Sequence, residues 1–231
     1  MMALFSDLLN LLFPPVCTVC KKRLIRGEKY ICLSCLSDLP ETDFHLLKDN
    51  KIEELFAGRF NFCRIASFAY FVKGGSVQTL IHELKYNNNP DLGCYLGELC
   101  GSKLQGSTFL NDIDYLVPVP LHPNRMKLRG YNQAEKIAEG IATQTGISVC
   151  SGNLKRVVDN TSQTKQSKFD RIVNTEGIFE AENPHLFSGK HLLLIDDVLT
   201  TGATSESCVK ALIEANEDIK VSIYTFGVVL G

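Results

Sequence analysis

The chain has almost no net charge, no internal repeat and no low-complexity segment. Its 231 residues include 24 Lys and Arg against 26 Asp and Glu, which gives a formal net charge of -2. A chain this close to neutrality has no overall electrostatic attraction for nucleic acid, so a role of that kind would require a local basic patch. The Walker-type pattern G-x4-G-K-[ST] is also absent, which argues against a nucleoside triphosphatase.

The N-terminus, MMALFSDLLNLLFPP, lacks the features of a secretory signal. It has no Lys or Arg, Asp7 lies inside the apolar run, and the run stops at Pro14 and Pro15 rather than at a small-residue cleavage site. It is also too short to span a bilayer. The spacing of its leucines favours a short amphipathic helix that packs on its own domain, with membrane contact as the alternative. We therefore expect a soluble, cytoplasmic protein without stable membrane insertion.

Two pairs of cysteines near the N-terminus have metal-ligand spacing. The chain has nine cysteines, and an odd number argues against a disulfide framework and for a reducing compartment. The segments CTVC and CLSC contribute Cys17, Cys20, Cys32 and Cys35. Two close thiolate pairs can complete a tetrahedral shell around Zn²⁺, and because four sulfurs leave no open position, this zinc would be structural. Two redox-active pairs, or a chance arrangement, are the alternatives.

From about residue 63 the sequence alternates between strand-like and helix-like segments. Strands are expected at 64–72, 114–120, 190–198 and 220–230, and helices at 76–86, 132–146 and after Pro90 and Gly202. This alternation predicts βαβ units and an α/β fold with a mainly parallel sheet flanked by helices. We therefore divide the chain into an N-terminal module with the four cysteines, residues 1–58, and an α/β domain, residues 59–231.

The segment LLLIDDVLTTGAT, residues 192–204, reads as a buried strand, two acids and the start of a helix. Ligands of a parallel α/β sheet bind beyond the carboxyl ends of its strands, where Asp196 and Asp197 are expected. Gly202 permits a turn that brings backbone amides close to an anion, and the dipole of the following helix favours negative charge there. The loop that would cradle a phosphate consists of Thr200, Thr201, Gly202, Ala203 and Thr204.

The two carboxylates are unsuited to contact phosphate, because like charges repel. They are suited to accept hydrogen bonds from sugar hydroxyls, directly or through Mg²⁺. A ribose 5-phosphate satisfies both halves of the site. The alternative is an ordinary strand-turn-helix with a pair of acids at its end.

This run resembles the phosphoribosyl diphosphate (PRPP) signature of type I phosphoribosyltransferases. Together with the cysteine pairs after LLFPP and the segments ELKYNNNPDLGCYLGEL and VPVPLHPNRMKLRGYNQAEKIA, it resembles the ComF family over nearly the whole chain. The resemblance implies a zinc-binding module followed by a type I phosphoribosyltransferase fold that takes PRPP with Mg²⁺. For competence members of the family it also implies a role in natural transformation, with incoming single-stranded DNA and other competence proteins as partners.

Basic residues follow the expected strand 114–120, where a pyrophosphate loop belongs. Breaking the bond between the anomeric carbon of PRPP and its pyrophosphate builds negative charge on the leaving group, which cations stabilise. Arg129 is the first candidate for this role, and Arg125 and Lys127 are expected to assist. With Asp196 and Asp197, Arg129 forms the predicted catalytic set. A solvated basic turn is the alternative.

The polar stretch 155–176 is expected to form a mobile loop or an exposed hairpin. Its Gln163, Arg171 and Asn174 align with a segment of the family. That likeness favours a lid that closes over PRPP, and an exposed loop without such a role is the alternative.

The residues leave three functions open. The first is a PRPP-dependent transferase, although no acceptor pocket is readable. The second is a DNA-binding accessory in which the basic segments hold a DNA backbone while Tyr131 and Phe169 stack on bases. The third is a PRPP sensor without catalysis. The histidines, His82 among them, stand alone in the sequence and are expected to be structural or surface residues.

Overall fold

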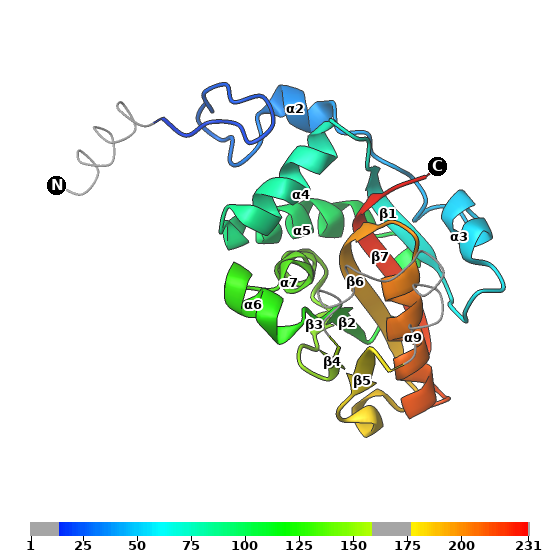
Figure 1. The fold of residues 1–231 in the computed structure, drawn as a ribbon. Helices are drawn as coiled ribbons and strands as arrows, with labels where there is room; N and C mark the ends of the chain where they lie inside the picture. Colours follow the sequence, from blue (N-terminus) through cyan, green and yellow to red (C-terminus); the bar gives the residue numbers. More distant parts are fainter. Residues whose placement is uncertain (1–13, 159–176, 231) are drawn as a thin grey trace.

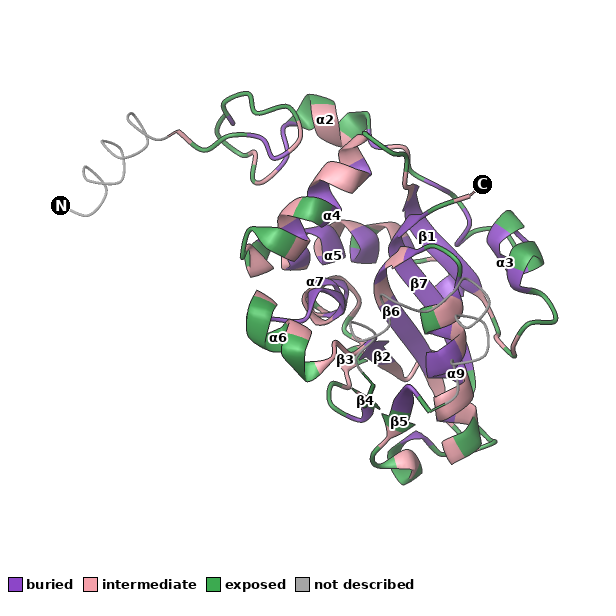
Figure 2. Ribbon diagram, in the orientation of Figure 1, coloured by how far each residue is buried: buried purple, intermediate pink, exposed green. Residues whose placement is uncertain are grey.

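A five-stranded parallel sheet forms the centre of the molecule (Figure 1). The computed structural model describes residues 14–158 and 177–230. The strand order is β1-β7-β6-β2-β3, and every neighbouring pair is parallel. The bounds are β1 Ile65–Tyr70, β2 Tyr115–Pro118, β3 Ser148–Val149, β6 His191–Leu199 and β7 Lys220–Val228. The inner strands β6 and β7 are buried along most of their length (Figure 2), as their apolar sequences require.

Helices cover both faces of this sheet. On one side lie α4 (Ser76–Tyr86), α5 (Pro90–Leu104) and α7 (Gln133–Thr145), and on the other lies α9 (Ala203–Ala215) (Figure 1). The shorter elements are α2 (Leu33–Ser37), α3 (Lys51–Phe56), α6 (Pro123–Arg129) and 3-10 turns at Thr108–Leu110 and Pro184–Phe187. A separate antiparallel pair is formed by β4 (Leu154–Arg156) and β5 (Phe179–Ala181). The predicted class, a mainly parallel sheet flanked by helices, is confirmed.

The strand order places a topological switch point between β2 and β6. After β2 the chain passes through α7 to β3 on one side, whereas β6 pairs with the other side of β2. Because the strands are parallel, the carboxyl ends of β2 and β6 open at the same edge of the sheet. The connections diverge at such a point and leave a crevice between them. The topology alone therefore indicates where a ligand would bind.

The segment before the sheet is tied to its edge strand β1. Asn50 caps α3 and donates from Nδ2 to the carbonyl oxygen of Ile65 at 2.9 Å. Glu53 of α3 forms an ion pair with Arg64 at 2.8 Å. Helix α3 thus contacts the α/β part, although it precedes the predicted domain boundary at residue 58.

Strand β6 runs through the acidic pair to Leu199, close to the expected strand 190–198. One local expectation differs from the structure. The basic segment after β2 is helical rather than a loop, because Pro123 occupies the first turn, the His122 ring accepts a hydrogen bond from the Asn124 amide at 3.3 Å, and Gly130 ends the helix with a φ of 78°.

Some predictions fall on residues that the structure does not describe. These are the N-terminal helix and most of the polar stretch, including Gln163, Phe169, Arg171 and Asn174. The flanks of that stretch, β4 and β5, pair as an antiparallel ladder. Among the described helices, none combines the length and apolar character needed to cross a membrane.

Candidate functional site

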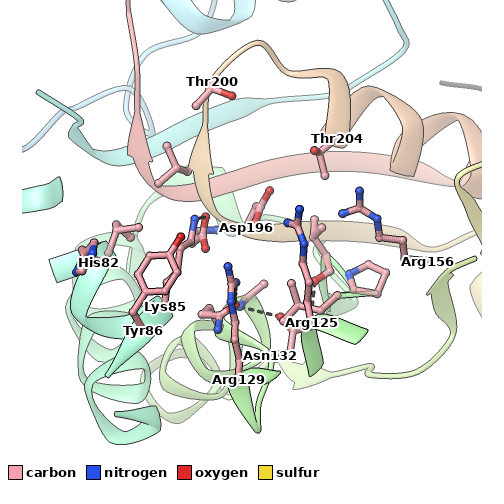
Figure 3. A pocket seen from close by; sticks show the side chains of 18 of the residues that line it. His82, Lys85, Tyr86, Arg125, Arg129, Asn132, Arg156, Asp196, Thr200 and Thr204 are labelled. Atoms are coloured by element: carbon pink, nitrogen blue, oxygen red, sulfur yellow. Dashed lines mark hydrogen bonds and ion pairs between the residues drawn. The ribbon is translucent and has the colours of Figure 1, made fainter. Parts of the chain in front are cut away.

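A cavity of about 440 Å³ opens at the switch point of the sheet. Its walls come from the ends of β2 and β6, the start of α9, and helices α4, α6 and α7, with Arg156 of β4 at one end (Figure 3). The predicted site residues that line it are Asp196, Asp197, Thr200, Thr204, Arg125 and Arg129. The other predicted residues, Thr201, Gly202, Ala203 and Lys127, lie outside its lining.

The acidic pair lies inside strand β6, so its two side chains leave on opposite faces of the sheet. The Asp197 carboxylate accepts a hydrogen bond from Lys85 of α4, and the distance between Lys85 Nζ and Asp197 Oδ1 is 2.9 Å. The Asp197 amide donates to Asp196 Oδ1 at 2.8 Å. Asp197 is only 8% exposed, and both carboxylates border the cavity. The two acids therefore flank the end of β6, and both reach the cavity.

Burial and charge make the acidic pair electrostatically strained. Burial, and then the neighbouring Asp197 charge, raise the pKa of Asp196 to about 7, against the opposing effects of the Asp197 amide, Lys85 and Arg156. A proton or a cation at Asp196 relieves this strain. The pair thus offers a site that favours a divalent cation, or hydroxyl donors, once the carboxylate is ionised.

The raised pKa predicts how Asp196→Asn affects stability at different pH values. When folding raises the pKa of an acid, the folded protein loses stability as the pH rises from the unfolded-state pKa toward the folded-state pKa. The asparagine oxygen can still accept the Asp197 amide. The variant should therefore gain melting temperature over the wild type at about pH 8, and much less at about pH 5, in thermal melts without ligand.

Asp114→Asn is the matched control for that experiment. The His191 amide and Lys190 lower the pKa of Asp114, so this acid stays ionised throughout the same pH range. Its variant should differ from the wild type by a constant amount between about pH 5 and pH 8. A pH-independent effect of Asp196→Asn would contradict the strain that we assign to the acidic pair.

The loop after β6 presents the amino end of α9 to the cavity. Gly202 precedes the helix with a φ of 76° and has no side chain to cap the first amides. The first amides of a helix have no partner within it, and the helix dipole favours an anion at this end. Thr200 and Thr204 border the cavity beside them (Figure 3). The geometry suits an anion such as phosphate.

Two residues from the segment before β1 support this loop, and sequence reasoning missed both. The Phe56 ring packs so tightly on Gly202 that a Cβ there would lie 2.1 Å from Phe56 Cε1. Arg59 donates to the Thr201 carbonyl at 2.9 Å and forms an ion pair with Glu206 of α9 at 2.8 Å. The ring and the guanidinium hold the backbone of the loop from outside the cavity.

This packing predicts that Gly202→Ala lowers the free energy of unfolding by more than the positive φ alone would. Gly146 offers the control, because its φ is 75° and nothing lies within 4 Å of an added Cβ. Gly146→Ala should cost about 1 kcal/mol, whereas Gly202→Ala should cost roughly 1–3 kcal/mol more through the clash with Phe56. Urea unfolding of the two variants measures the difference. Equal costs would show that Phe56 yields without penalty.

Cationic side chains surround the end of β6. Arg125 and Arg129 of α6 and Arg156 of β4 line the same cavity as Asp196 (Figure 3). Lys85 of α4, which the sequence analysis did not single out, completes the set. Lys127 of the same short helix is exposed and outside the cavity. A site with this much positive charge around two acids suits a ligand with several anionic groups and a polar centre.

Of the two aromatic residues predicted to stack on bases, Tyr131 does not line the cavity, and Phe169 lies outside the described residues. Tyr131 is 8% exposed and donates its hydroxyl to the Leu84 carbonyl, so it packs in the core and is not available to stack on a base. His82 and Tyr86 of α4 border the cavity instead, with ring centroids 4.7 Å apart. The prediction that His82 is a structural or surface residue agrees with its exposed position, but it did not indicate that His82 lines the cavity. The helical spacing of His82, Lys85 and Tyr86 places the three on one face of α4.

The four paired cysteines gather into one cluster, with all four sulfurs within 4.8 Å of one another. The Cys20 and Cys32 sulfurs are 3.7 Å apart, near the roughly 3.8 Å edge of a tetrahedron with ~2.3 Å metal–sulfur bonds. Burial acts to raise the pKa of Cys17, but hydrogen bonds from backbone amides at Cys20, Cys32 and Val19 lower it to about 6. The four sulfurs are close enough to one another to bind a metal ion.

These features define a class of protein. It is an α/β protein with a cavity at the switch point of a parallel sheet and with a four-cysteine module. No protein-family model matches the chain. It is 30% identical to the DNA utilization protein YhgH of Salmonella typhimurium over 137 residues, which cover 58% of this chain and 60% of that protein. It is 34% identical to the competence protein ComFC of Bacillus subtilis over 110 residues, 48% of this chain and 42% of that protein.

The YhgH protein of Escherichia coli extends the similarity, with 26% identity over 201 residues, 86% of this chain and 84% of that protein. The chain is thus similar to DNA utilization and competence proteins, over about two fifths to four fifths of their length. Among solved structures, the allosteric regulatory enzyme of purine biosynthesis is similar with a TM-score of 0.40 and 24% identity, over 62% of this chain and 29% of that one. The glutamine PRPP amidotransferase of B. subtilis is similar with a TM-score of 0.40 and 22% sequence identity, over 62% of this chain and 30% of that one.

Proposed function

We propose that the chain is a PRPP-binding, phosphoribosyltransferase-like protein that acts in the use of incoming DNA. One observation carries the proposal: the acidic pair Asp196–Asp197 and the open amino end of α9 border the same cavity, at the switch point of the sheet. The names of the relatives, DNA utilization and competence proteins, support the process, and the reducing cytoplasm fits the free cysteines.

Different residues of the cavity would bind different parts of the ligand. The amides at the start of α9, with Thr200 and Thr204, would hold the 5-phosphate. Asp196 and Asp197 would accept hydrogen bonds from the ribose hydroxyls, and Mg²⁺ bound with the ligand would lower the repulsion between these acids and the phosphates. Arg125 and Arg129 would neutralise the pyrophosphate. If an acceptor is used, Arg129 is the residue that we expect to stabilise the leaving group.

Magnesium dependence provides the test of PRPP binding. Wild-type protein should bind PRPP more tightly with Mg²⁺ than without it in calorimetry, because the acidic pair favours a metal-bound ligand. The double variant Asp196→Asn with Asp197→Asn should lose this dependence, with affinity in Mg²⁺ lower by roughly tenfold or more. A wild type that shows no PRPP binding would refute the proposal.

A charge-matched control separates the site from the net charge of the protein. Glu217 and Asp218 are exposed and lie outside the cavity. Glu217→Gln with Asp218→Asn removes the same charge and should keep the magnesium dependence. Release of pyrophosphate in a screen of acceptors then distinguishes a transferase from a PRPP sensor.

A second candidate function is binding of single-stranded DNA at the mouth of the cavity. Tyr86 lines the cavity and is 64% exposed, and the Arg129 guanidinium lies 5.7 Å from the centre of its ring. Aromatic and basic side chains together suit a single strand. Lys127 distinguishes the two candidates, since it lies outside the cavity. Its replacement by alanine should weaken salt-dependent binding of oligothymidine if this function holds, and leave PRPP binding unchanged.

We also infer that the cysteine cluster holds one structural Zn²⁺. Cys20 and Cys63 are both exposed, but only Cys20 belongs to the cluster. Purified wild type and Cys63→Ser should contain one zinc per chain by elemental analysis, and Cys20→Ser should contain markedly less. Chelation should increase hydrogen exchange in residues 15–36 and leave the sheet protected. Metal-free wild type with a protected cysteine module would overturn the inference.

A further inference from the structure

Gln133, the first residue of α7, has an amide whose orientation is fixed by Arg129. Arg129 Nη1 donates to Gln133 Oε1 at 2.7 Å. A guanidinium can only donate, so it must face the oxygen of the amide and not the nitrogen. The Nε2 group of Gln133 is thereby directed away from Arg129, with both of its hydrogens available.

This Nε2 group has no acceptor among the described residues, although it is buried. Gln133 is 1% exposed and borders the cavity. An unpaired buried donor costs about 1–3 kcal/mol, so proteins rarely keep one without a use. A ligand in the cavity would supply the missing acceptor.

The surroundings of Gln133 indicate which acceptor fits. The amino end of α7 begins here, with its dipole favouring negative charge, and its Asn132 cap accepts from the Ala134 amide. Arg129 is held at Gln133 itself, and Arg125 borders the same cavity. Among the described acids that line the cavity, Asp197 is already paired with Lys85. The matching group is an oxyanion.

We propose that Gln133 Nε2 donates a hydrogen bond to a diphosphate oxygen of the ligand, with Arg129 as the residue that orients it. Gln133 is then a binding residue in its own right, on the wall of the cavity that faces the phosphate loop from the β2 side. This rests on the proposed function for the identity of the full ligand, but its own test uses inorganic pyrophosphate as well as PRPP.

Two substitutions separate donation to the ligand from support of Arg129. Gln133→Glu keeps an oxygen for Arg129 and replaces the donor by an acceptor. Gln133→Met removes both. If Gln133 donates to the ligand, both variants should bind magnesium pyrophosphate and magnesium PRPP at least tenfold more weakly, with melting temperatures near that of the wild type. The glutamate charge would itself repel a diphosphate, so the deciding result is that of Gln133→Met added to Arg129→Ala. If Gln133 only positions Arg129, this addition should cause no further loss of binding, and the proposal is overturned.

The remaining outcomes are also decisive. If the glutamate variant does not fold, Gln133→Met is compared with Arg129→Ala and the double variant. A further loss in the double variant supports donation, and no further loss overturns it. Wild type that binds pyrophosphate through Gln133 but not PRPP would refute the proposed function and keep this inference. Binding of neither probe overturns both.

Discussion

Two carboxylates in a central strand of a buried sheet impose the main constraint on this protein. Ionised acids are costly to bury and repel each other, and the high pKa of Asp196 reflects both effects. Such a pair persists only where cations are close, which explains why Lys85 of α4 reaches the end of β6. The positive lining of the cavity is therefore a requirement of the fold as well as a feature of the site. A stable cavity of this kind is prepared for a ligand that carries its own cation.

The second constraint is the shape of the loop after β6. An anion can approach the first amides of α9 because the chain turns at Gly202, which has no side chain to cap them, and among the described residues only the Ala203 amide has a side-chain acceptor, Thr201 Oγ1 at 3.5 Å. Phe56 and Arg59 hold that turn from the side away from the ligand. Both residues belong to the segment that connects the cysteine module to the sheet. The shape of the loop after β6 therefore depends on contacts from a distant part of the chain, since Arg59 and Thr201 are 142 positions apart.

The sequence predicts contacts between residues that are close in the chain, and it does not predict those between residues that are far apart. The acids and threonines of β6 and its loop are neighbours in the chain, so their pattern is readable, and helix α4 follows from its apolar spacing. The contacts that complete the site join residues far apart: Lys85 and Asp197 are 112 positions apart, and Arg59 and Thr201 are 142 apart. No local pattern indicates such pairs. The helical form of 123–129 was missed because a proline and basic residues read as a loop, although Pro123 suits a first helical turn.

The depth of the polar groups favours a small ligand over a polymer. A DNA backbone can meet Arg125 and the exposed Tyr86, but Gln133, whose Nε2 group has no acceptor among the described residues, is almost completely buried. Only a compact molecule can satisfy groups at that depth. The two helix starts, of α7 and α9, approach the cavity from opposite sides of the switch point, and the acidic pair lies between these connections. A ligand with an anionic group at each end and hydroxyls in the middle would satisfy the two helix starts and the acidic pair together. A single strand of DNA would leave the buried Gln133 unpaired.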